Sequence, residues 1–354
     1  MDSNLLLVGI VIVVALIFDH INGFHDAANS VATIVATKVL SPFQAVAWAA
    51  FWNFIAAVGA LFLGSKVAKT VGSGLVDLAY VTPHTILAGL TGAIVWNLIT
   101  WWKGIPSSST HALFGGYAGA AMTNAVLQGG IGDWFAPIIL GEMPSWSNPY
   151  PTGWISTIAF IFLAPLLGVA LGQILMLGVL WVARKWDPTK TQHHFRRLQL
   201  FSAAIFSYSH GANDAMKTAG IITGVLVTSG YLASFEVPTS VIFAAHGAIA
   251  LVTLSGGWKI IHTMGSRLTK LKAPGGIAAE TAAATSILFS TELGMPVSTT
   301  HTIAGAIVGV GSLRRRKAVR WALTQEILIA WLLTIPASAL VGAASMVLVN
   351  LLPF

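Results

Sequence analysis

The stretch "GFHDAANS" (23–30) places a histidine, an aspartate and an asparagine directly after the apolar run 5–22, which is long enough to enter a lipid bilayer. A charged side chain in the hydrocarbon costs about 2.5–3.5 kcal/mol on insertion scales. Such side chains persist where they face protein or a water-filled cavity and carry a function. The stretch therefore predicts a functional polar site inside a membrane.

Composition supports a membrane protein. Of 354 residues, 55% are hydrophobic and only 9% are charged, whereas soluble domains have about 25% charged residues. Further apolar stretches lie at 43–63, 85–102, 112–127, 154–183, 239–256, 277–293 and 321–350. We expect an all-α polytopic membrane protein without cofactors. Because the chain has no cysteine and no Walker-type Gly-Lys-Ser/Thr sequence, disulfides, thiolate metal sites and ATP as the energy source are excluded.

The second half of the chain repeats the first. "GANDAMKT" (211–218) matches "GFHDAANS", with 214 − 26 = 188 positions between the aspartates, and "PVSTTH" (296–301) matches "PSSSTH" (106–111) at 301 − 111 = 190. Between them "GWKIIHTMGSRL" (257–268) parallels "GSKVAKTVGSGL" (64–75). Three matches in one order at nearly constant spacing indicate a duplicated unit.

Charge predicts how the two copies are oriented. Basic residues cluster in "ARKWDPTKTQHHFRR" (183–197), "RLTKLK" (267–272) and "RRRKAVR" (314–320), while the linker 129–153 contains Asp133 and Glu142 but no Lys or Arg. Short basic loops are typical of the cytoplasmic side and do not indicate nucleic-acid binding. Equivalent loops then face opposite sides, which predicts inverted repeats with both termini external. Lys66 and Lys69 fall on the outer side and oppose this orientation.

The expected organisation follows from the repeat. We assign 1–128 to the first inverted repeat, 129–197 to an external linker, a connecting span and a cytoplasmic basic loop, 198–313 to the second inverted repeat, and 314–354 to a basic loop and a C-terminal span. Discontinuous helices of inverted-repeat transporters meet at the bilayer midplane. The two Gly-x-x-Asp motifs are expected to break crossing helices, and the Pro-Ser/Thr-His segments to form re-entrant or broken hairpins.

Acidic residues inside the membrane are the predicted cation or proton sites. Asp26 and Asp214 occupy equivalent positions and suit Na⁺ as metal ligands or a proton, and Glu280, in "GGIAAETAAATS", is a lone intramembrane carboxylate of the same kind. His25, at the repeat position of Asn213, is either a proton carrier or a structural polar side chain. Lys217 either binds an anion or only pairs with Asp214 on the same helix.

The hydroxyl-rich tracts predict an anion site. One hydroxyl suffices to cap a helix, whereas three or four at two equivalent helix starts, beside free N–H groups, indicate a cradle for a tetrahedral oxyanion. The predicted anion ligands are Ser107, Ser108, Ser109, Thr110, Ser298, Thr299, Thr300, Asn29, Asn213, Lys217 and Thr218.

Four further polar residues are secondary candidates. His111 and His301 close the two tracts and either bind the anion, transfer protons or hold the broken backbone. Asn53 and His246 correspond at an offset of 246 − 53 = 193 and are predicted to line the same cavity.

The four motifs "GFHDAANS", "GANDAMKT", "PSSSTH" and "PVSTTH" resemble those of the PiT family of inorganic phosphate transporters. The resemblance implies symport of phosphate with Na⁺ or H⁺, inverted repeats, and a phosphate–cation site formed by Asp26, Asn29, Asp214 and the hydroxyls of both tracts. Phe24-His25, in place of the usual Ala-Asn, is similar to the bacterial low-affinity branch, which is often proton-coupled and carries metal–phosphate complexes. We therefore expect a bacterial inner-membrane protein, and leave its oligomeric state open.

Three alternatives stand beside a phosphate symporter working by alternating access. A sulfate symporter fits the same cradle, although phosphate has an O–H group that a carboxylate can accept and sulfate has none. An intramembrane phosphatase would use Ser109 or Thr110 as nucleophile and His111 as base, but neighbouring residues on a helix do not face each other and no Arg pair lies nearby. An anion channel would conduct without a coupling cation.

Overall fold

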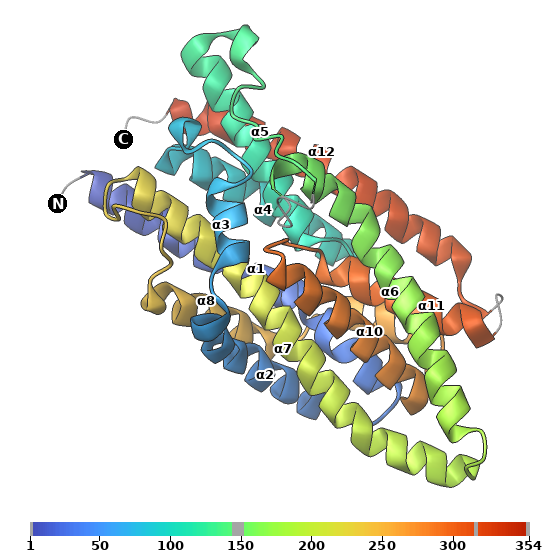
Figure 1. The fold of residues 1–354 in the computed structure, drawn as a ribbon. Coiled ribbons are helices and arrows are strands. Elements are labelled where there is room, and N and C mark those ends of the chain that lie inside the picture. Colours follow the sequence, from blue (N-terminus) through green and yellow to red (C-terminus); the bar gives the residue numbers. More distant parts are fainter. Residues whose placement is uncertain (1–2, 144–151, 315–317, 352–354) are drawn as a thin grey trace.

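The computed structural model describes residues 3–143, 152–314 and 318–351 (Figure 1). Within these ranges the chain folds into helices without a β-sheet. They are α1 (Ser3–Ala36), α2 (Pro42–Leu63), α3 (Lys66–Ser73), α4 (Pro83–Lys103), α5 (Ser109–Gly129), α6 (Gly153–Ala183), α7 (Pro188–Thr228), α8 (Thr239–Thr253), α9 (Trp258–His262), α10 (Ala273–Glu292), α11 (Thr299–Arg314) and α12 (Trp321–Asn350), with 3₁₀ turns η1 (Leu78–Tyr80) and η2 (Ile131–Asp133) and a π-helical turn η3 (Thr263–Arg267).

The helices have membrane dimensions. Five of those described, α1, α2, α4, α6 and α12, are long and apolar enough to span a bilayer, and α8 with the segment 258–265 forms a sixth candidate span bent by 67°. The prediction of an all-α polytopic membrane protein is confirmed.

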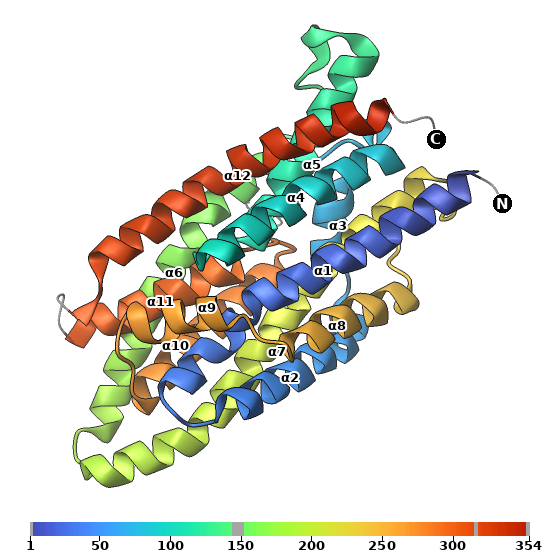
Figure 2. The same ribbon diagram turned by 180° about the vertical axis from the view of Figure 1, so that it is seen from behind.

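The order of helices α1 to α6 recurs in α7 to α12. The matched motifs lie on α1 and α7, on α3 and α9, and at the joints α4–α5 and α10–α11. The long helix that follows each repeat packs on the other repeat: α6 lies against α10 and α11, and α12 against α4 and α5. Figures 1 and 2 show that α1 and α7 pack together and run in opposite directions. Opposite courses of equivalent helices are what an inverted repeat requires.

The Pro-Ser/Thr-His segments form the predicted broken hairpins. α4 ends at Gly104, whose φ of 68° is left-handed, and after four residues α5 begins with Ser108 as its N-cap, whose Oγ accepts from the His111 amide at 3.1 Å. The second hairpin repeats this cap, with Ser298 Oγ accepting from the His301 amide at 3.2 Å. Both tips are buried.

The Gly-x-x-Asp motifs do not break their helices, so that prediction is wrong. α1 and α7 run without interruption through Gly23 and Gly211, because one Gly costs a helix only about 1 kcal/mol and no Pro removes a hydrogen bond. These glycines allow close packing instead. A Cβ at Gly23 would lie 3.1 Å from the Ile249 carbonyl oxygen on α8, and one at Gly211 would lie 2.6 Å from the Asn53 carbonyl oxygen on α2.

Both chain ends lie at one end of the bundle and the α6–α7 connection lies at the other (Figures 1 and 2). The basic segment 183–197 is mostly helical, because α7 begins at Pro188. Residues 315–317 of the third basic cluster and 144–151 of the linker lie outside the described residues.

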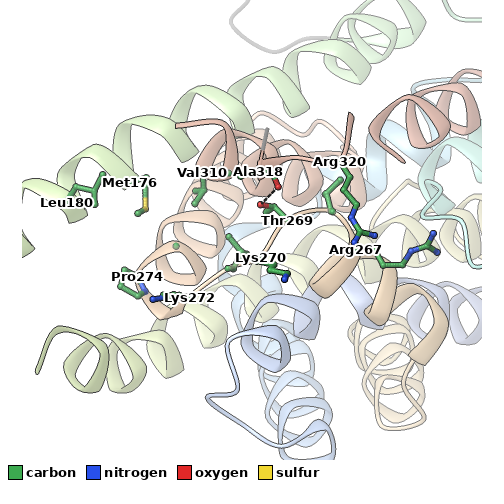
Figure 3. A pocket seen from close by; sticks show the side chains of 14 residues that line it. Met176, Leu180, Arg267, Thr269, Lys270, Lys272, Pro274, Val310, Ala318 and Arg320 are labelled. Atoms are coloured by element: carbon green, nitrogen blue, oxygen red, sulfur yellow. Dashed lines mark hydrogen bonds between the residues drawn. The ribbon is translucent and has the colours of Figure 1, made fainter. Parts of the chain in front are cut away.

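Near the α6–α7 connection, basic side chains surround a cavity of about 680 Å³. Arg267, Lys270, Lys272 and Arg320 line it together with apolar residues of α6 (Figure 3). This arrangement fits the predicted gathering of positive charge on one side of the membrane.

Close packing of α12 on α5 gives a test of the fold. A Cβ at Gly342 would lie 3.0 Å from the Gly116 Cα and still closer to its carbonyl oxygen, whereas a Cβ at Gly9 on α1 would meet no atom within 4 Å. Alanine is favoured over glycine in helices by about 1 kcal/mol, so Gly9→Ala should preserve or raise stability. Gly342→Ala should lower it by about 1–3 kcal/mol, the usual effect of overpacking. Thermal unfolding of the detergent-solubilised variants measures both, and equal stability would contradict the packing.

Candidate functional site

Eight polar side chains from four helices meet in the interior. We call them the central cluster: Asp26 and Asn29 of α1, Thr110 of α5, His210, Asp214 and Lys217 of α7, and Thr299 and Thr300 of α11. None is more than 4% exposed. The antiparallel contact of α1 and α7 supplies the charged groups, and the two hairpin tips supply the hydroxyls.

The structure brings the two motif aspartates together. Asp26, His210 and Asp214 each offer a ligand atom, and these atoms lie within 4.8 Å of one another. Carboxylate and imidazole ligands of this kind could hold a divalent transition metal. His210 is not among the residues predicted from the sequence, although it precedes Asp214 by four positions and therefore lies on the same helical face.

Asp26 is held by its neighbour and by the opposite hairpin. His25 Nδ1 lies 2.9 Å from Asp26 Oδ1, and Thr300 donates to that oxygen at 3.3 Å. Asn29 Nδ2 donates to Thr300 at 2.8 Å and to Thr299 at 3.2 Å. The first-half motif is thus tied to the second-half hydroxyl tract.

Asp214 is held by a buried ammonium group. Lys217 Nζ lies 2.5 Å from Asp214 Oδ1 and also donates to Thr110 Oγ1 at 2.5 Å and to the Val297 carbonyl at 2.8 Å. Asp214 Oδ2 accepts from Thr299 at 3.2 Å and lies 3.1 Å from His210 Nε2. The predicted Asp–Lys pair exists, and the same ammonium reaches the first hydroxyl tract.

The two halves differ where their sequences differ. Lys217 stands at the position equivalent to Asn29, since 217 − 29 = 188. With the His210 imidazole neutral, two carboxylates and one ammonium give the central cluster a formal charge of −2 + 1 = −1. The cluster is therefore not neutral without a further cation or proton.

Several predicted anion ligands point elsewhere. Ser107 bonds to Thr334 of α12 at 2.8 Å, and Ser108 and Ser298 are occupied as N-caps.

Three more of the predicted anion ligands form no hydrogen bond with the central cluster. Asn213 Nδ2 donates to Thr291 at 2.8 Å, and Thr218 donates to Asp19 at 2.9 Å. Ser109 Oγ is buried with no hydrogen-bond partner among the described residues. Of the eleven predicted ligands, the structure brings Thr110, Thr299, Thr300, Asn29 and Lys217 together.

Glu280 forms a second acidic cluster. Thr33 donates to it at 2.6 Å and Gln199 at 2.8 Å, and Ser202 donates to its other oxygen. Thr33 follows Asp26 by 33 − 26 = 7 positions, two helical turns or about 10 Å along α1. Glu280 therefore lies beyond the central cluster, toward the end of the bundle that carries the α6–α7 connection.

The secondary candidates have separate places. The His111 and His301 rings meet edge to face at 4.5 Å, so the two hairpin tips touch through them, and His301 stacks on Trp331 at 3.6 Å. Asn53 Oδ1 lies 3.2 Å from His210 Nδ1 and so adjoins the central cluster. His246 Nδ1 instead lies 2.8 Å from the carbonyl of Ile242 on its own helix.

Asp19 is likewise not among the residues predicted from the sequence. This fully buried residue of α1 accepts a hydrogen bond from Thr218 of α7. It lies inside the apolar run 5–22, and it precedes Asp26 by 26 − 19 = 7 positions, which places both carboxylates on one helical face. A lone acid in an apolar run was the available signal.

Sequence comparison matches the Phosphate transporter family twice, at residues 22–188 and 181–342. A probable low-affinity inorganic phosphate transporter of Rhizobium meliloti (strain 1021) is 49% identical over 347 residues, 97% of either chain. One of Bacillus subtilis (strain 168) is 41% identical over 360 residues, covering 99% of this chain and 100% of the relative.

Among solved structures, "The sodium-dependent phosphate transporter" superposes with a TM-score of 0.83 at 24% identity, covering 98% of this chain and 100% of that one. It shares the fold. Because the family and its named members are transporters, the enzymatic alternative falls away. Two matches that together cover almost the whole sequence, and near full-length relatives of the same description, show that the chain belongs to the phosphate transporter family.

Proposed function

We propose that the protein is a symporter that moves inorganic phosphate with a proton or Na⁺ across the bacterial inner membrane by alternating access around the central cluster. Its relatives are named low-affinity inorganic phosphate transporters. One observation carries the proposal: carboxylates from α1 and α7 and hydroxyls from both hairpin tips share one buried cluster.

Phosphate binds between the hairpin tips. Thr110, Thr299, Thr300 and Asn29 supply neutral donors, and Lys217 supplies a positive charge. The first turns of α5 and α11 add N–H groups that have no partner within their helices. The carboxylates can accept the O–H group of protonated phosphate, which favours phosphate over sulfate.

The coupling cation is needed because the site is already negative. A phosphate anion would join a cluster with a formal charge of −1. At an effective dielectric constant of 20, two unit charges 4 Å apart interact with about 4 kcal/mol. One bound cation offsets much of this repulsion, so phosphate and cation each bind poorly alone.

Asp26 and its surroundings receive that cation. Asn29 Oδ1, on the helix that carries Asp26, is a buried acceptor without a donor among the described residues, and such an oxygen calls for a partner. It suits Na⁺, and the solved transporter of the same fold is sodium-dependent by name. His25 and His210, one beside each aspartate, suit a proton equally. Glu280 is a further station on the cation's path.

Lys217 takes the place of a cation in the second half. Its ammonium lies among three oxygens, those of Asp214, Thr110 and Val297, as a bound ion would. At the equivalent position Asn29 has no charge, so Asp26 remains available for the mobile cation.

A metal–phosphate complex is the second candidate substrate. Asp26, His210 and Asp214 together form a ligand set for a divalent metal, and the metal would travel as cargo with phosphate. Uptake of radioactive zinc that requires phosphate would support it, and uptake of phosphate unaffected by chelators would exclude it.

Each half comprises six helices in inverted orientation, with both termini external. The two family matches, 22–188 and 181–342, support halves that include α6 and most of α12. The shared position of the chain ends, opposite the basic cavity, supports the orientation.

Uptake of labelled phosphate into proteoliposomes tests the proposal. We expect accumulation under an imposed proton or Na⁺ gradient and weak competition by sulfate. Flux that is indifferent to both gradients would identify a channel, and equal competition by sulfate would identify a general oxyanion carrier.

Loss of either central carboxylate should abolish coupled uptake. Truncating one partner of a buried, hydrogen-bonded charge pair costs about 2–5 kcal/mol of binding, so Asp26→Asn and Asp214→Asn should each reduce uptake about a hundredfold or more. Asp133 is exposed, and Asp133→Asn serves as the control that should keep wild-type uptake. Uptake in proteoliposomes, with size-exclusion profiles to verify folding, is the measurement, and full activity of both variants would refute the site.

Replacing Lys217 by the residue of the other half should change the cation requirement. In Lys217→Asn, Asp214 loses its tethered ammonium, and a second mobile cation is needed in its place. Uptake should then rise more steeply with Na⁺ concentration, and more charge should move per phosphate. Lys69→Asn removes an exposed lysine and should resemble the wild type. An unchanged Na⁺ dependence of a folded, active Lys217→Asn protein would contradict the role of Lys217.

A further inference from the structure

Asp19 is a buried carboxylate that the central cluster does not use. It is 0% exposed, and only its Oδ1 has a partner, the hydroxyl of Thr218 at 2.9 Å. Its Oδ2 has no hydrogen-bond donor within the part of the chain that the structure describes. A charged oxygen in this state is strongly disfavoured unless something neutralises it.

A second unsatisfied oxygen lies one turn further along the same helix. Asn22 is 3% exposed, and its Oδ1 likewise finds no donor in the described ranges. Residues three apart on a helix are neighbours on its surface. Asp19, Asn22 and Thr218 thus gather a carboxylate, an amide and a hydroxyl where α1 meets α7. Oxygens of these three kinds are the ligands that hard cations prefer.

The position of this group relative to the central cluster is set by α1 and α7. Asp19 precedes Asp26 by two turns on α1, and Thr218 follows Asp214 by one turn on the antiparallel α7. Glu280, bound to Thr33 of α1 and to Gln199 and Ser202 of α7, lies on the opposite side of the central cluster. Buried acids therefore occur at three levels along the α1–α7 pair.

Among the described residues Asp19 has no ion-pair partner. The buried ammonium of Lys217, the residue before Thr218, is bonded instead to Asp214, Thr110 and Val297. The equivalent position in the second half is Ser207, since 207 − 19 = 188. This acid is therefore particular to the first half, and no symmetry-related partner compensates it.

We propose that Asp19, with Asn22 and Thr218, forms a second binding station for the coupling cation, between the central cluster and the end of the bundle that carries the chain termini. The proposal rests on the proposed symport. On entering from that end, the cation meets Asp19 first, then Asp26, and then Glu280. Proton and Na⁺ share the chemistry of the station, and the experiment separates them.

The test measures phosphate uptake into proteoliposomes against Na⁺ concentration at fixed pH, and against an imposed pH gradient without Na⁺. Asp19→Asn keeps the shape and removes the charge. Its half-maximal concentration of the driving cation should rise at least about fivefold, the lower end of couplings between ligand sites. Its KM for phosphate at saturating cation should change little. If the half-maximal concentration rises in the Na⁺ titration, the cation is Na⁺; if it rises in the pH-gradient experiment, the cation is a proton.

Two further variants keep the result interpretable. Ser207→Ala removes a buried hydroxyl that also lacks a partner among the described residues, at the equivalent position, and should leave cation dependence unchanged. Asp19→Glu keeps the carboxylate and should restore most of the wild-type response, and it replaces Asp19→Asn if that variant does not fold. Wild-type cation dependence in a folded Asp19→Asn protein, or a rise in phosphate KM as large as the cation shift, would overturn the station. Wild-type uptake without any cation dependence would instead refute symport itself.

Discussion

The structure depends on one constraint: a carboxylate buried in the bilayer has no water to solvate it, so another part of the chain must supply its partners. Asp26 on α1 finds them in His25 and in Thr300 of the second-half hairpin, and Asp214 on α7 finds them in Lys217, His210 and Thr299. Thr300, which donates to Asp26, and Lys217, which donates to Thr110, link the two halves and place the polar site at their contact.

Glycines allow close helix packing beside this contact. Gly23 and Gly211 let α8 and α2 approach the backbone of α1 and α7 directly beside the two aspartates. Ser108 and Ser298 cap the inner helix starts. Thr299 and Thr300 are then free to donate to the two acids, and Thr110 to accept from Lys217. In each tract one hydroxyl thus maintains the break in the chain while its neighbours form the site.

The two halves share a scaffold but not a chemistry. Lys217 opposite Asn29, Asp19 opposite Ser207 and His25 opposite Asn213 give each half a different set of charges at equivalent places. One half holds a fixed ammonium beside its aspartate, while the aspartate of the other half has no ammonium beside it. The proposed coupling to a cation rests on this difference.

The sequence by itself determined the membrane class, the duplication, the broken hairpins and the pair Asp26 and Asp214, because hydropathy, repeat spacing and Pro-Ser/Thr punctuation are local signals. Tertiary structure alone decided which hydroxyls reach the acids, that α6 and α12 each pack on the other repeat, and that α1 and α7 stay unbroken. A glycine in sequence is compatible with either a break or a close helix contact, and only the neighbouring helix distinguishes them. The places of His210 and Asp19 likewise follow from the antiparallel crossing of α1 and α7, since contacts between residues nearly two hundred positions apart have no local signature.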